Sequence, residues 1–230
     1  LTAELIDREA HGFGFVHRAQ PRVVSVTQST ELGTVYSVDE LRTLVAHAHA
    51  RGLLVHMDGA RLANAAASLG KDFRAFTTDV GIDAVSFGGT KNGCLGAEAV
   101  VSLRPEISAA IPFVRKSDMQ LASKMRFISA QLVAMLTDGL WLRNAGHANA
   151  MAQRLAAAVR TIPGVSLSQP TQANAVFARL PMAVITRLQE RFRFYVWDHV
   201  TGEVRWMCSW DTTESDIDRF ATAIAEEMAR

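Results

Sequence analysis

The sequence predicts an α/β protein whose larger part is built on a mainly parallel sheet. Two observations lead to this prediction. Short apolar, β-branched runs alternate with helical patterns, and charged side chains stand directly after several of these runs. Strand–helix–strand order is typical of parallel sheets, whose ligands collect beyond the carboxyl ends of the strands. We therefore expect a functional site where these charges follow the strands.

The first half of the chain supplies the strands of this sheet. Between the first two, SVDELRTLVAHAHARG is a predicted helix because Ser37 and Glu40 have capping-box spacing and Gly52 suits a C-terminal cap. A further helix or turn is expected to begin near Leu62. The predicted strands are VVSVTQ at 23–28, LLVHMD at 53–58, DAVSFGG at 83–89 and EAVVSL at 98–103.

The second half begins with a long helical region, predicted from Lys116 to Leu142 and ending near Gly146. A helix from His147 to Arg160 follows, then strands near VSLS, NAVFARL, FYVWD and VRWMCSW, and a closing helix from Thr213. This second alternation predicts a smaller α/β domain. The expected division is into residues 1–145 and 146–230.

Composition limits the classes of partner. Lys and Arg number 24 against 23 Asp and Glu, so no basic surplus indicates binding of nucleic acid or of an anionic membrane. No apolar stretch reaches the roughly 20 residues that cross a bilayer, and the first residues lack a signal-peptide pattern, so we expect a cytoplasmic location. Cys94 and Cys208 are expected to be reduced packing residues, and no His or Cys cluster predicts a metal site. Of these classes of partner, a small-molecule substrate is therefore expected.

Charged residues stand at the ends of, or within, apolar strands. Asp58 and Arg61 follow the second strand, Lys91 follows the third, and Arg205 interrupts VRWMCSW. Such a charge is costly unless it is paired. Structural explanations are open for three of them: Asp58 could cap the helix near Leu62, Lys91 could be a solvated turn residue, and Arg205 could form a surface salt bridge on an edge strand.

Taken together, the acid, the arginine and the lysine suit a cofactor with a ring nitrogen, a phenolic oxygen and an aldehyde, which is pyridoxal phosphate (PLP). A carboxylate such as Asp58 keeps the ring nitrogen protonated, so that the ring withdraws electrons. The Lys91 amine can condense with the aldehyde as a Schiff base and later act as a general base. Gly88, Gly89 and Gly93 are predicted to let backbone and ring approach closely.

HMDGARLANA followed by DAVSFGGTKNG resembles the low-specificity threonine aldolases of the β-eliminating lyase group, within the fold type I PLP-dependent enzymes. The likeness extends to VTQSTELGTVYS and VRWMCSWDTTESDID. It implies that Asp58 pairs with the pyridine nitrogen and that Arg61 hydrogen-bonds the ring hydroxyl. It also implies that Lys91 binds the cofactor covalently and that Arg205 grips the substrate α-carboxylate.

The same resemblance implies a homo-dimer or homo-tetramer, because active sites of this fold type lie at a subunit interface. Arg126 or Lys124 would then reach the cofactor phosphate of a neighbouring subunit. Residues 1–145 would be the C-terminal portion of the PLP-binding large domain. The N-terminal segment of that domain, with a phosphate-binding loop and a ring stacked on the cofactor, is expected to lie outside residues 1–230. Glu31 stands where the family usually has a histidine, so the base for the β-hydroxyl is open.

These implications predict a PLP-dependent aldolase that cleaves L-threonine or a phenylserine-like β-hydroxy-α-amino acid to glycine and an aldehyde. Two alternatives are open. One is another reaction on the same cofactor, such as β-elimination, transamination or racemisation. The other is an inactive truncated chain that serves only as an interaction module.

Overall fold

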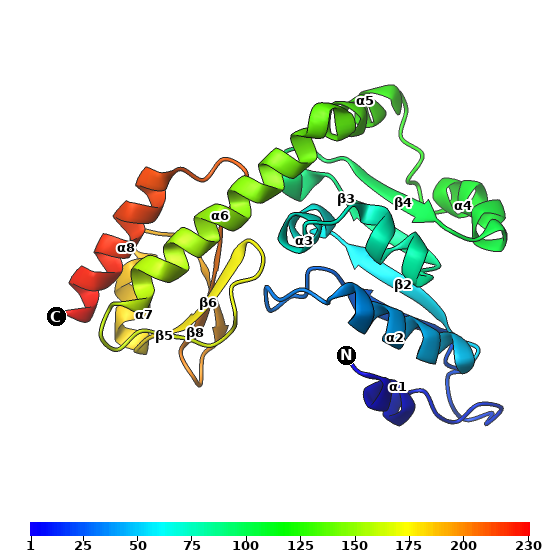
Figure 1. The fold of residues 1–230 in the computed structure, drawn as a ribbon, viewed down its shortest axis with the longest axis horizontal. Helices are drawn as coiled ribbons and strands as arrows, with labels where there is room; N and C mark the ends of the chain where they lie inside the picture. The colour runs from blue at the N-terminus through cyan, green and yellow to red at the C-terminus, as the bar shows by residue number, and fades with distance from the viewer. The chain divides into compact units, whose positions relative to one another are not determined.

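The computed structural model describes residues 1–230 (Figure 1). The chain forms two compact units, each with its own sheet. The first unit contains residues 1–28, 36–62 and 69–137, and the second contains 29–35, 63–68 and 138–230. Two short segments of the N-terminal half therefore pack with the C-terminal unit. No helix is long and apolar enough to span a membrane.

The first unit holds the predicted mainly parallel sheet, in the strand order β1-β2-β3-β4. The first three strands are parallel, and β4 is antiparallel to β3. All four predicted strands are confirmed, although the prediction did not include the reversal at β4. A short connection explains that reversal, because a parallel return needs a long crossover. The strands are β1 (Val23–Thr27), β2 (Leu54–Gly59), β3 (Ala84–Gly88) and β4 (Glu98–Ser102), and the connection contains η3 (Thr90–Asn92).

The two faces of this sheet differ in character. Val26, Val55, Met57 and Val85 point to one face and are buried, and helix α2 (Val38–Ala50) packs against β2. The predicted capping box of α2 is confirmed. Side chains alternate along each strand, so the residues between these buried ones point to the opposite face, which is polar. There the His56 ring joins Ser25 Oγ, 2.8 Å from Nδ1, and Ser86 Oγ, 2.9 Å from Nε2.

The predicted single helix from Lys116 to Leu142 is wrong. Helix α4 (Pro105–Ser117) ends within its first two residues, α5 (Arg126–Leu136) covers its middle, and α6 (Leu140–Arg160) runs through Gly146 without a break. The chain leaves the helical conformation where Met119 and Lys124 have φ of 58° and again where Asp138 has φ of 50°. A right-handed helix cannot continue through such residues. The periodic apolar pattern did not reveal these breaks.

The second unit is an antiparallel sheet covered on one face by three helices (Figure 1). Its strand order is β5-β6-β8-β7, so β8 is an internal strand. Val176, Ala178, Val204 and Trp206 point to the helices and form the core. The strands are β5 (Ser166–Leu167), β6 (Ala175–Arg179), β7 (Tyr195–Asp198) and β8 (Glu203–Met207), and the helices are α6, α7 (Met182–Gln189) and α8 (Glu214–Met228).

The remaining elements are short. The first unit also has α1 (Ala3–Glu9), η1 (Phe73–Phe76) and η2 (Thr78–Val80); α3 (Leu62–Leu69) and η4 (Thr137–Gly139) complete the chain.

A buried carboxylate, Asp83, joins several elements of the first unit just before β3. Its Oδ1 accepts a hydrogen bond from Arg104 Nη1 at 2.9 Å. Its Oδ2 accepts one from the Val55 N–H at 2.6 Å and lies 2.9 Å from His49 Nε2. Burial by itself raises the pKa of Asp83, but the hydrogen bonds from Val55, His49 and Arg104 outweigh burial and hold the pKa below its ordinary value.

We expect Asp83→Asn to lower the free energy of unfolding by about 2–3 kcal/mol, because it breaks charge-assisted bonds to a buried group. This loss of stability is smaller than the loss expected for a fully buried ion pair, since Arg104 and His49 are partly exposed. A lowered pKa stabilises the fold above the ordinary carboxyl pKa, and this contribution is lost as the pH falls through the folded-state pKa. Denaturant midpoints measured from neutral to acidic pH check both statements.

Asp79→Asn is the matched control for this variant. Asp79 forms an exposed ion pair with Arg74 at 2.8 Å, and such pairs contribute about 0–1 kcal/mol. Equal losses of stability in the two variants would contradict the role given to Asp83.

Candidate functional site

Asp58 lies at the carboxyl end of β2 on the polar face of the sheet, in register with Thr27 and Ser86. Its Oδ1 accepts a hydrogen bond from the Ala60 N–H at 2.9 Å, which is an Asx-type turn. The turn precedes α3, so this contact does not cap the first turn of that helix as the structural alternative required. Oδ2 of Asp58 accepts no hydrogen bond from the protein and can accept one from a ligand.

Lys91 lies in η3, directly after β3, and is exposed. Its ammonium makes no hydrogen bond or ion pair with the protein, whereas the next residue, Asn92, is buried. Since β2 and β3 are neighbouring parallel strands, Asp58 and Lys91 follow the same edge of one sheet. Arg61 is half-buried in the turn between β2 and α3.

The turns after β2 and β3 pack directly against each other. A Cβ added to Gly88 would lie 2.6 Å from the Ala60 carbonyl oxygen, and one added to Gly89 would lie 2.5 Å from that of Ala97. Gly93 has φ of +111°, which disfavours any other residue. The protein's own packing and turn geometry thus account for these glycines. The sequence pattern alone could not distinguish this cause from the close approach of a ring.

Arg126 and Lys124 lie at and just before the start of α5, and both are exposed. The Arg126 guanidinium lies over the Phe127 ring, 4.9 Å from its centroid. Neither residue forms an ion pair with the protein. Their contact with the phosphate of a neighbouring subunit stays a prediction.

Arg205 lies on β8 in the second unit. The alternative of a salt bridge on an edge strand is wrong, because β8 lies between β6 and β7 and Arg205 pairs with no carboxylate. Instead its guanidinium lies 4.8 Å from the ring centroid of Trp197 and 5.7 Å from that of Tyr195. Its Nε is buried and has no hydrogen-bond partner. A half-buried cation of this kind is suited to a ligand anion.

Tyr195 and Trp197 were not among the site residues predicted from the sequence. These two residues are two positions apart in FYVWD, so both side chains face the same side of β7. Tyr195 is directly opposite Arg205 in the sheet. The sequence contained two aromatic residues at strand spacing. Only the pairing of β7 with β8 shows that they lie beside Arg205.

Glu31 is exposed and lies in the turn 29–35, which belongs to the second unit. Thr30 Oγ1 and Thr34 Oγ1 are 2.6 Å apart within this turn, and a Cβ on Gly33 would lie 3.0 Å from that of Ala175. Glu31 itself makes no hydrogen bond or ion pair. Its role as a base stays open.

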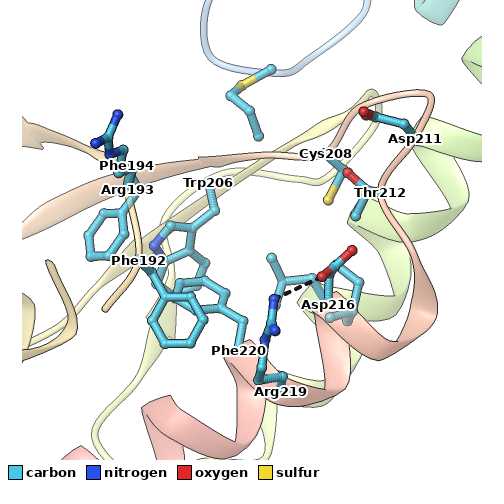
Figure 2. Close-up of a pocket in the computed structure, with 13 residues that line it drawn as sticks. Phe192, Arg193, Phe194, Trp206, Cys208, Asp211, Thr212, Asp216, Arg219 and Phe220 are labelled. Atoms are coloured by element: carbon cyan, nitrogen blue, oxygen red, sulfur yellow. Dashed lines mark hydrogen bonds and ion pairs between the residues drawn. The ribbon is translucent and has the colours of Figure 1, made fainter. Parts of the chain in front are cut away.

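A pocket of about 340 Å³ lies on the helix-covered side of the second sheet (Figure 2). Phe192, Trp206 and Phe220 line it, together with Asp216 and Arg219, which form an ion pair at 2.9 Å. None of the predicted site residues lines this pocket. It is therefore separate from the candidate site around Arg205, which faces the other side of β8.

The two cysteines are free, as expected. Burial raises the pKa of the Cys208 thiol to about 12, so its nucleophilic thiolate is scarcely populated at neutral pH. Burial also raises the pKa of Cys94, with a smaller contribution from Glu98. Both thiols suit packing.

Comparison with known proteins identifies the family. The model of the beta-eliminating lyase family matches residues 1–181. The chain is 44% identical over 215 residues to a low specificity L-threonine aldolase from a Pseudomonas species, covering 93% of this chain and 62% of that protein. It is 45% identical over 216 residues to the Pseudomonas aeruginosa protein of the same name, covering 94% and 60% respectively. The chain thus spans about three-fifths of the length of these curated relatives.

Solved structures agree. A threonine aldolase from Leishmania major superposes with a TM-score of 0.90 at 27% identity, covering 99% of this chain and 67% of that one. A protein described as a putative L-allo-threonine aldolase from Listeria monocytogenes has a TM-score of 0.70 at 16% identity, which bears on the fold alone. It covers 99% of this chain and 65% of the other. The predicted fold type I architecture is confirmed, and the chain belongs to the beta-eliminating lyase family.

Proposed function

We propose that the full-length protein is a PLP-dependent aldolase that cleaves L-threonine, or a related β-hydroxy-α-amino acid, to glycine and an aldehyde. The names of the Pseudomonas relatives support the choice of reaction. The observation that carries the proposal is the arrangement of Asp58 and Lys91. They follow neighbouring parallel strands at one sheet edge, and each keeps a polar atom free of protein partners.

The residues of the first unit fit PLP chemically. Asp58 offers a carboxylate oxygen to a protonated ring nitrogen, Arg61 a donor to the ring oxygen, and Lys91 an amine to the aldehyde. When bound, PLP withdraws the electron pair that is left on Cα after bond cleavage. The negative charge of Asp58 favours the protonated ring nitrogen on which this withdrawal depends.

Side chains of this chain would bind the substrate and transfer protons. Arg205 holds the substrate carboxylate and so sets the orientation of the Cα–Cβ bond. In the cleavage this bond breaks, the β-hydroxyl loses its proton to a base, the former Cβ carbon becomes the aldehyde carbon, and Cα gains a proton to give glycine. The Lys91 amine would be suited to proton transfer at Cα.

We further propose that the protein works as a homo-dimer or homo-tetramer in the cytoplasm. Helices α4 and α5 support the first statement, because α4 has no buried residue and both helices expose large apolar side chains. These include Phe113, Val114, Phe127 and Val133. A second subunit covering this surface would also approach Arg126. The two free cysteines suit a reducing compartment.

Product analysis tests the reaction. Incubation of the full-length protein with PLP and L-threonine is expected to yield glycine and acetaldehyde in equal amounts. Formation of a keto acid in place of glycine would contradict the aldolase and indicate a transaminase or β-eliminating enzyme. No product from threonine or phenylserine would favour the interaction-module alternative.

A further inference from the structure

We propose that Tyr195 and Trp197 are positioning residues that hold the Arg205 guanidinium in one plane for a carboxylate ligand. This inference rests on the proposed function, in which Arg205 binds the substrate carboxylate. It adds two residues from a neighbouring strand to that task. We call Tyr195, Trp197 and Arg205 the aromatic clamp.

The clamp follows from the register of three strands. Arg205 on β8 lies directly opposite Tyr195 on β7 and opposite Phe177 on β6. The Trp197 ring meets the Phe177 ring edge to face, with centroids 5.4 Å apart and planes at 87°. Phe177 is only 1% exposed. The buried Phe177 ring therefore anchors Trp197, and Trp197 in turn lies against the guanidinium.

The clamp stabilises a charge without consuming its hydrogen-bond donors. A protein carboxylate near Arg205 would occupy the guanidinium N–H groups and compete with a ligand. Aromatic faces instead attract the cation through their π electrons. No guanidinium nitrogen of Arg205 donates a hydrogen bond to the protein, and Nε is buried without a partner. The planar fork is thus oriented and still available to both oxygens of a carboxylate.

A different arrangement distinguishes Arg205 from Arg191, an arginine of the same unit that also lies over a ring. Arg191 lies 5.5 Å from the Phe192 centroid, but it also forms an ion pair with Glu226 at 3.6 Å. Phe192 lines the pocket on the other side of the sheet (Figure 2). This second arginine–aromatic pair therefore supplies a matched control in the same unit.

The test compares Trp197→Leu, Trp197→Phe and Tyr195→Leu with Phe192→Leu in the full-length holoenzyme. Loss of the cation–π contact leaves the guanidinium less well oriented for a carboxylate, so we expect KM for the amino acid to rise about tenfold in Trp197→Leu. We expect about threefold in Tyr195→Leu, whose ring is more distant and more exposed. Values of kcat should stay within about twofold, and Trp197→Phe and Phe192→Leu should resemble the unaltered protein.

A second readout does not depend on turnover. The Arg205 Nε–H proton, observed by NMR, should carry a ring-current shift that Trp197→Leu removes and Trp197→Phe largely keeps. Titration with acetate, a carboxylate without an amino group, should move this signal in the unaltered protein. The apparent Kd for acetate should rise about tenfold in Trp197→Leu.

The outcomes separate this inference from the proposed aldolase. Weaker acetate binding in Trp197→Leu supports the clamp even if the protein does not cleave threonine, a result that would refute the proposed function alone. Equal acetate affinity in the unaltered protein and Trp197→Leu, or no acetate response of Arg205 at all, overturns the clamp. Because Tyr195 is 70% exposed, Tyr195→Leu tests the same point if Trp197→Leu does not fold.

Discussion

Replacing Lys91 by alanine is expected to lower kcat for threonine cleavage by about 10³-fold or more. The same change should remove the visible absorbance band of lysine-bound PLP. The physical reason is that Lys91 supplies the only amine in the turn after β3, and this amine is exposed and has no protein partner. Alanine can neither bind the aldehyde nor transfer a proton. Absorbance titration with PLP and steady-state kinetics measure the two effects.

Two further variants separate the chemistry of Lys91 from its charge. Lys91→Arg keeps the positive charge but cannot form the Schiff base at neutral pH, so it should also lose the absorbance band. Lys71→Ala removes another exposed lysine of the first unit and should change neither band nor rate. If the Lys91→Ala protein kept the band, a different lysine would have to hold the cofactor.

Replacing Arg205 by leucine is expected to lower kcat/KM by about 100-fold or more, which corresponds to the loss of a charge-assisted, two-pronged contact with a carboxylate. Arg205→Lys should recover only part of this loss, because a lysine ammonium keeps the charge but not the planar fork. Stability should change little in Arg205→Lys, since Arg205 makes no ion pair with the protein. Kinetics with threonine and thermal unfolding of each variant give the two readouts.

Arg219→Leu is the control for the Arg205 variants. Arg219 is an exposed arginine of the same unit whose ion pair with Asp216 lies on α8, beside the pocket in Figure 2. Its loss should leave kcat/KM unchanged. An equally large loss in Arg219→Leu would point to a general effect on the unit and against a specific role for Arg205.

Most secondary-structure elements could be predicted because their signals are local. The capping box at Ser37 and Glu40 forms within one turn of α2, and alternating or continuous apolar residues mark the strands. The helical region after Ser102 was less predictable. Its apolar residues repeat at helical spacing, and the positive φ values at Met119 and Lys124 leave no comparable mark in the sequence, whereas the break at Asp138 falls on an Asp-Gly pair, which is a turn signal. The direction of β4 follows from the short connection between β3 and β4, which cannot make a parallel return.

The sequence by itself determined the family, the α/β class and the charged candidates Asp58, Arg61, Lys91 and Arg205, because residue type and order along the chain carry that information. Only the tertiary structure decided what surrounds those candidates. Strand pairing placed Arg205 on an internal strand beside Tyr195 and Trp197 and without a carboxylate. Register and packing are properties of segments far apart in the chain, so no single stretch of sequence encodes them.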